Sequence, residues 1–124
     1  MANPNIVSVA SIYGKIACDT DVATSAASLV SNAASSGKIF KINSLIIANI
    51  DGTNSADITV TVRNAAGNTI YSYLANTVAV PADATLIVLS KDTSIYLEED
   101  MSLYVQASAA GDLSATCSYE EISE

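Results

Sequence analysis

The segment from Ser36 to Asn64 constrains the fold most, because it joins a long apolar run to a strictly alternating one. Residues 38–50 are rich in β-branched side chains, and residues 57–63 alternate between apolar and polar. Between them, residues 51–54 are Asp, Gly, Thr and Asn, types that favour turns. The pattern predicts two antiparallel strands joined by a short loop, the first buried on both faces along part of its length.

The alternation of apolar and polar residues differs between the two predicted strands of this segment. Alternation breaks at Asn43 and Ser44, so we expect a bulge or bend midway along the first strand. In the second strand the even-numbered residues from Ile58 to Val62 are apolar, while the odd-numbered ones are polar. That strand is therefore expected to have one face against a core and one face in water.

Short strands and turns account for the rest of the chain. Glycine-containing turns at residues 65–68 and 109–111 predict hairpins, and the continuous apolar run 84–89 predicts a central strand. Residues 22–32 favour an extended segment, with a helix as the alternative. About 8–10 strands at this spacing predict an all-β fold, a single-domain antiparallel β-sandwich of jelly-roll type.

Composition narrows the class of protein. The chain has 124 residues, of which 50% are apolar and 15% are charged, enough to form one domain with its own core. We expect residues 1–15 to form an N-terminal arm or edge strand and residues 16–124 to form the sandwich. The N-terminal residues lack the pattern of a secretory signal, so folding in a cytosol is expected.

The net charge of the chain limits the kinds of partner that it is expected to bind. The formal net charge is −8, from 13 acidic and 5 basic residues. Nucleic-acid binding relies on Lys and Arg to neutralise phosphates, so this balance predicts no nucleic-acid partner. The same balance argues against an anionic membrane, and no apolar stretch approaches the length of a membrane span.

The residues for catalysis and metal binding are sparse. With no histidine, the chain has no Ser-His-Asp or Cys-His arrangement. Carboxylate pairs such as Glu98 and Glu99 fit solvated corners between strands better than acid-base catalysis. Asp51, Asn54 and Asp57 do not match the spacing of a calcium loop, and turn formation explains them better. We therefore predict no enzymatic activity, no cofactor and no metal.

The two cysteines, Cys18 and Cys117, lie far apart in the sequence, and the sequence does not show whether they meet. Cys117 continues an alternating apolar pattern in the last predicted strand, so it is interpreted as a small buried hydrophobic residue. A disulfide is the alternative.

A chain of this kind is best interpreted as a structural or interaction protein. We predict partner contacts from the weakly apolar N-terminal segment, through Ile6, Val7, Val9, Ile12 and Tyr13. A carbohydrate-binding β-sandwich module is the alternative from another class, with Tyr71, Tyr73, Tyr96 and Tyr104 as candidates for a stacking platform.

Three groups of segments carry a resemblance to a known family. They are residues 35–42, residues 80–86, and residues 95–100 leading into 105–113 with a terminal 118–122. In this order they resemble small virion structural proteins of tailed phages, notably those of cyanophages.

The resemblance implies a β-sandwich protein made in the host cytoplasm and located in the virion. It implies a capsid decoration or cement protein that binds the shell of major capsid protein, and a homo-oligomer, with a trimer favoured. A neck, tail or fibre-attachment protein of the virion is the alternative within the same class.

Overall fold

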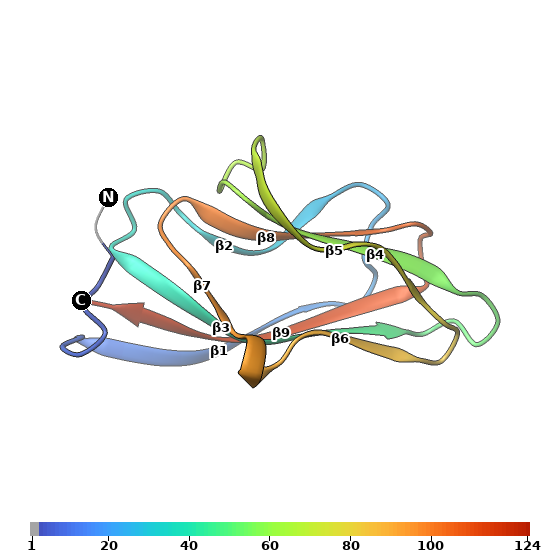
Figure 1. The fold of residues 1–124 in the computed structure, drawn as a ribbon, viewed down its shortest axis with the longest axis horizontal. Helices are drawn as coiled ribbons and strands as arrows, with labels where there is room; N and C mark the ends of the chain where they lie inside the picture. Colours follow the sequence, from blue (N-terminus) through green and yellow to red (C-terminus); the bar gives the residue numbers. More distant parts are fainter. Residues whose placement is uncertain (1–2) are drawn as a thin grey trace.

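The computed structural model describes residues 3–124 as two antiparallel sheets packed face to face (Figure 1). The predicted all-β sandwich is confirmed. The elements in the described residues are β1 (Ser11–Asp19), β2 (Ala27–Asn32), β3 (Lys38–Asn49), β4 (Ala56–Arg63), β5 (Ile70–Val80), β6 (Thr85–Leu89), the short 3-10 helix η1 (Lys91–Thr93), β7 (Ile95–Leu97), β8 (Met101–Ala107) and β9 (Leu113–Ser123).

The order of the strands gives the topology of a jelly roll. One sheet, here called sheet A, has the order β1-β9-β3-β6, and β7 also pairs with β3. The other, sheet B, has the order β2-β8-β4-β5. Successive strands such as β1 and β2, or β3 and β4, therefore lie in opposite layers, which is the arrangement of a double-sheet jelly roll.

The predicted pairing of the two strands in residues 36–64 is wrong. β3 lies in sheet A between β9 and β6, whereas β4 lies in sheet B between β8 and β5. Residues 50–55 carry the chain across the sandwich instead of closing a hairpin. The alternating pattern shows only which side chains share a face, and both strands satisfy it by turning their apolar faces toward the same core from opposite sides.

The hairpin predicted at residues 109–111 is wrong, because β8 lies in sheet B and β9 lies in sheet A, so this turn carries the chain between the sheets. The other local predictions, a bulge and a hairpin that depend on a few adjacent residues, are confirmed. The register of β3 against β9 shifts between Ile42 and Ser44, which confirms the irregularity expected at Asn43. The hairpin between β4 and β5 closes with a hydrogen bond from the Asn64 N–H to the Thr69 carbonyl, and Gly67 there has φ +82°. Residues 27–32 form strand β2, so the extended prediction is confirmed in that part.

The run 84–89 does not form a central strand. It becomes β6 at the edge of sheet A, where β3 is its one partner among residues 3–124, and the side chain of Ile87 is 62% exposed. η1 then interrupts the edge before β7 continues it along β3. A short apolar run indicates burial, but it cannot distinguish a central strand from an edge strand that lies over the core.

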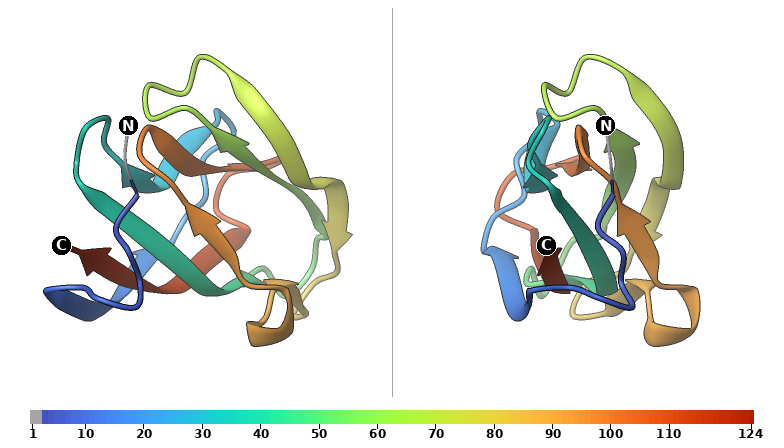
Figure 2. Two further views of the ribbon diagram at one scale, coloured as in Figure 1. Left: turned by 60° about the vertical axis from the view of Figure 1, so that its left-hand side comes forward. Right: turned by 90° about the vertical axis from the view of Figure 1, so that its left-hand side faces the viewer.

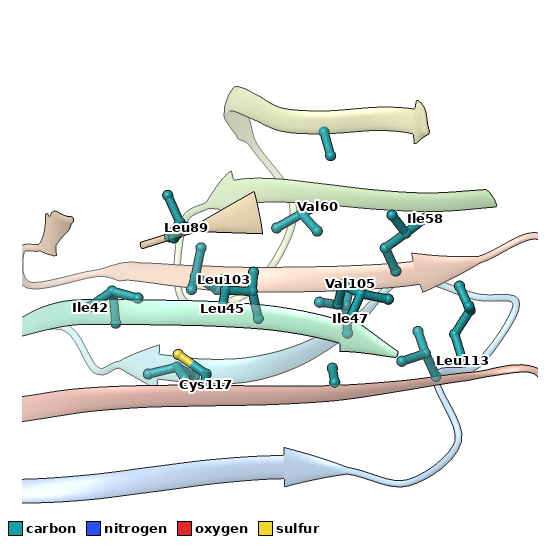
Figure 3. Close-up of a cluster of buried hydrophobic side chains, with 14 of the residues drawn as sticks. Ile42, Leu45, Ile47, Ile58, Val60, Leu89, Leu103, Val105, Leu113 and Cys117 are labelled. Atoms are coloured by element: carbon teal, nitrogen blue, oxygen red, sulfur yellow. The ribbon is translucent and has the colours of Figure 1, made fainter. Parts of the chain in front are cut away.

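The core lies between the two sheets (Figure 3). Ile42, Leu45 and Ile47 of β3 are fully buried, as are Leu103 and Val60 on the opposing sheet. Further core members are Ile58, Val105, Leu113, Ala115 and Cys117. Burial of such side chains is the main stabilising contribution, at about 1.5–3 kcal/mol for each large aliphatic residue.

Two buried asparagines tie the sheets together where the chain crosses between them. The amide nitrogen of Asn32, at the end of β2, donates to the carbonyls of Lys38 (2.9 Å) and Leu97 (3.1 Å) in sheet A. The amide nitrogen of Asn49, at the end of β3, donates to the carbonyls of Asn54 (3.0 Å) and Val80 (2.9 Å), and Val80 belongs to sheet B. Each buried amide thus has two backbone carbonyl partners, at least one of them in the opposite sheet.

Replacing Asn49 by Ala is expected to lower the free energy of unfolding by about 1–3 kcal/mol, because two carbonyl groups lose their donor in a buried site. Urea titration of the two proteins measures the difference. Asn43→Ala is the matched control, since in the described part of the chain the Asn43 amide donates only to the Glu120 carboxylate, in a position that is only partly buried. Equal losses for the two variants would contradict the role assigned to Asn49.

Candidate functional surface

The strand β1 forms one edge of sheet A and pairs with β9 alone in residues 3–124. All nine of its residues pair in register with β9, without a shift. In Figure 2 this blue strand lies at the margin of the fold. Backbone groups on the outer side of an edge strand have no ladder partner within the sheet, so β1 presents a ready surface for another chain.

The N-terminal segment before β1 is held on the end of its own sandwich. The Asn3 side chain donates to the Glu98 carboxylate, and the backbone N–H of Ala10 donates to the Ser123 carbonyl at 3.0 Å. Pro4 is buried. The boundary expected between residues 15 and 16 falls inside β1, so the strand as a whole belongs to the sandwich.

The five predicted contact residues lie along this segment and the start of β1. Val7 is 91% exposed, Ile6, Ile12 and Tyr13 are each more than half exposed, and Val9 is half-buried. They do not share one face, because Ile12 and Tyr13 are adjacent in a strand and point to opposite sides of sheet A. Their contact with a partner stays a prediction.

A charge cluster that the sequence did not reveal lies across β1, β9 and β3. Lys15 of β1 and Lys38 of β3 both bind the carboxylate of Glu121, with N–O distances of 3.2 and 3.3 Å. Partial burial alone would raise the pKa of Glu121, but the hydrogen bonds from the two lysines outweigh it and hold the pKa below its ordinary value. Two lysines thus share one carboxylate at this end of sheet A.

Acidic side chains lie at the other end of β3 and β9. The Asp51 carboxylate accepts hydrogen bonds from the Asn54 side chain and the Thr53 N–H, which lower its pKa. Burial and the charge of Asp51 raise the pKa of Asp112. Asp51 and Asn54 therefore serve the turn, as expected. Among residues 3–124 no three side chains of metal-binding type gather into a group.

The tyrosines do not form a common platform. Tyr71 and Tyr73 are exposed on β5 of sheet B, and Tyr96 is exposed on β7 of sheet A. Tyr104 is half-buried on the outer face of sheet B, with the Arg63 guanidinium 4.9 Å from the centre of its ring. Only Tyr71 and Tyr73 are left as neighbouring exposed rings, which weakens the carbohydrate-binding alternative.

A shallow hollow on the outer face of sheet B offers little chemistry. It is lined by Asp57, Thr59, Thr77, Gln106, Ala107 and Ser108. Two of its hydroxyls already accept backbone hydrogen bonds, Thr59 from the Thr77 N–H and Ser108 from the Asp57 N–H. These groups serve the strand ends.

The two cysteines are free and point to opposite faces of sheet A. Cys117 is fully buried in the core, as predicted, and burial raises the pKa of its thiol to about 12. Ala17 is its partner in the β1–β9 ladder, so the next residue, Cys18, points outward and is exposed. The alternative of a disulfide between them within one chain is therefore wrong for this structure.

Comparisons with known proteins define the class of fold. No protein-family model matches the chain, and no curated protein matches it. A solved structure described as belonging to Bacillus endospore appendages, a novel family of disulfide-linked pili, is similar, with a TM-score of 0.53 and 16% sequence identity over 91% of this chain and 88% of that one. At this identity the likeness shows a shared β-rich fold. The described residues contain no helix that could cross a membrane.

Replacing Glu121 by Gln is expected to lower the melting temperature at pH 7 by about 2–5 °C, because an ion pair with two lysines is lost. A carboxyl group whose folded-state pKa is lowered stabilises the fold above its ordinary pKa, and this contribution disappears as the pH falls through the folded-state value. The difference between the two proteins should therefore shrink below about pH 4. Thermal melts from pH 7 to pH 3 measure it.

The matched control is Glu120→Gln on the same strand, because a glutamine oxygen can still accept the bond from Asn43. A Glu121→Gln difference that is the same at pH 7 and pH 3 would contradict the electrostatic origin.

Proposed function

We propose that this chain is a structural subunit of a larger protein assembly, and specifically a decoration or cement protein of a tailed-phage capsid. In this proposal it binds the shell of major capsid protein and stabilises it. It performs no catalysis, needs no cofactor, and joins the virion after synthesis in the host cytoplasm.

The observation that carries the proposal is the place of the resembling segments in the fold. Three of the resembling segments, residues 35–42, 95–100 and 118–122, are distant in the sequence but come together in sheet A, where Phe40 pairs with Leu97 and Ile39 pairs with Ile122. Of the other two, residues 80–86 run from β5 to β6, and residues 105–113 begin in β8 of sheet B. Part of the resemblance to virion proteins thus falls on neighbouring strands of one sheet. The shared β-rich fold of an appendage protein agrees with a general structural role.

Charge and surface are compatible with such a role. A net charge of −8 would complement a basic surface on a shell protein and would oppose binding to the packaged nucleic acid. A cement protein bridges neighbouring subunits by burying interface area, and specific stable interfaces typically bury about 1,200–2,000 Å².

Localisation in a particle reconstruction tests the proposal. We expect density that fits this sandwich at three-fold or quasi-three-fold positions of the capsid. Particles that lack the chain should release their contents at a lower temperature, and adding the purified chain should restore the wild-type value. Density only at the unique vertex or the tail would refute the cement role and favour a neck, tail or fibre-attachment protein.

A second candidate is a subunit that polymerises with itself into an appendage. The fold likeness to the protein described as forming disulfide-linked pili favours it, together with the exposed thiol of Cys18. Electron microscopy of the purified chain under oxidising conditions tests it. Filaments that dissolve on reduction and are absent from Cys18→Ser would support this candidate, and dispersed protein under both conditions would remove it.

A further inference from the structure

The four edges of the two sheets differ in how they are protected. β2 is short and shifts register between Ser28 and Val30. β5 shifts register at three places, and Thr77 in it has a positive φ of 48°. The edge formed by β6 and β7 is broken by η1. Short strands, bulges and interruptions are the devices by which proteins prevent edges from pairing with other chains.

β1 lacks these devices within the described part of the chain. It contains no proline, keeps one register along its whole length, and is exposed over the run 12–16. Its single charged residue near the middle is Lys15, and a lysine on an edge usually opposes pairing. A strand that pairs with this edge therefore needs an acidic residue opposite Lys15.

We propose that β1 pairs with β1 of a second copy of this chain, antiparallel and centred on Ala17. This register places Lys15 of each copy opposite Asp19 of the other. Lys15, Ala17 and Asp19 lie on the same face of sheet A, because they alternate along a strand without a bulge. The strand is thus complementary in charge to itself when it runs antiparallel, and the pairing follows a two-fold axis.

The charge cluster in each copy favours the same partner. Lys15 and Lys38 share the single carboxylate of Glu121, and their side chains are still 45% and 40% exposed. A carboxylate from Asp19 of the second copy brings the cluster closer to neutrality. On the outer face the same register sets Ile16 opposite Cys18, so an exposed isoleucine gains an apolar neighbour.

The pairing adds to the proposed function one contact through which subunits associate. It rests on the proposed role as a structural subunit. It predicts a two-fold dimer instead of the trimer that the family resemblance implies. If the β1 variants described below entered particles as the wild type does, this inference would fail while the structural role would stand.

Charge reversal on β1 tests the register directly. Lys15→Glu alone and Asp19→Lys alone each place like charges opposite one another in a homodimer, so each should weaken the dimer by about tenfold or more. An equimolar mixture of the two variants restores opposite charges at both positions. We expect sedimentation and native mass spectrometry to show weakened association for each variant alone and a 1:1 heterodimer in the mixture.

Matched controls separate this effect from damage to the fold. Lys91→Glu changes the charge by the same amount as Lys15→Glu but lies on the exposed helix η1, away from the β1 edge and the charge cluster, so it should leave the dimer intact. Asp92→Lys changes the charge by the same amount as Asp19→Lys on the exposed helix η1. Wild-type protein that is monomeric at about 100 μM, a trimer, or a mixture that fails to form the heterodimer would overturn the inference.

A cross-link gives a second measurement of the same register. In Ile16→Cys, the Cβ atom of the new cysteine should lie about 4.5–5.5 Å from the Cβ atom of Cys18 in the other copy. A short thiol-reactive cross-linker should therefore capture a covalent dimer. Ile87→Cys is the control, because Ile87 is similarly exposed, at 62% against 65% for Ile16, but lies at the opposite edge of sheet A. Equal cross-linking of the two variants would contradict the pairing.

Discussion

Burial of the inner face of β3 against sheet B is the interaction on which the rest of the structure depends. β3 is the longest strand, lies inside sheet A, and contributes Ile42, Leu45 and Ile47 to the core. Because its successor β4 lies in the opposite layer, the chain must leave one sheet and enter the other. Near such crossings the buried amides of Asn32 and Asn49 donate to backbone carbonyls of the other sheet. The apolar core and the hydrogen bonds of these buried amides therefore lie next to each other, near the points where the chain crosses between the sheets.

Because the inner faces of sheets A and B form the core, contacts with other molecules must use the sheet edges and the outer faces. Three of the four sheet edges carry bulges or interruptions, whereas β1 keeps an unbroken register. The cluster of Lys15, Lys38 and Glu121 lies at this margin. An edge with unpaired backbone groups and an incompletely balanced charge is suited to association with a chain of matching pattern.

Predictions from the sequence succeeded where the cause was local. The bulge at Asn43 follows from a break in alternation, and the turn at Gly67 follows from a residue that accepts positive φ. Pairing was mispredicted for β3 with β4 and for β8 with β9, and the run that became β6 was expected at the centre of a sheet. For the candidate surface, apolar composition indicated Ile12 and the residues before it, but no local signal joined Lys15 to Glu121. Those two residues meet only because β1 and β9, from opposite ends of the chain, are neighbours.

By itself the sequence determined that the chain forms a β-sandwich, which side chains of β4 face inward, and that residues 1–124 include no histidine. These properties depend on residue type and on the period of two along a strand, which any single strand displays. Only the tertiary structure decided which strands are neighbours, which of them form edges, and which charges come together. Those outcomes arise from competition among strands distant in the sequence for the same core, and alternation is equally satisfied by several pairings.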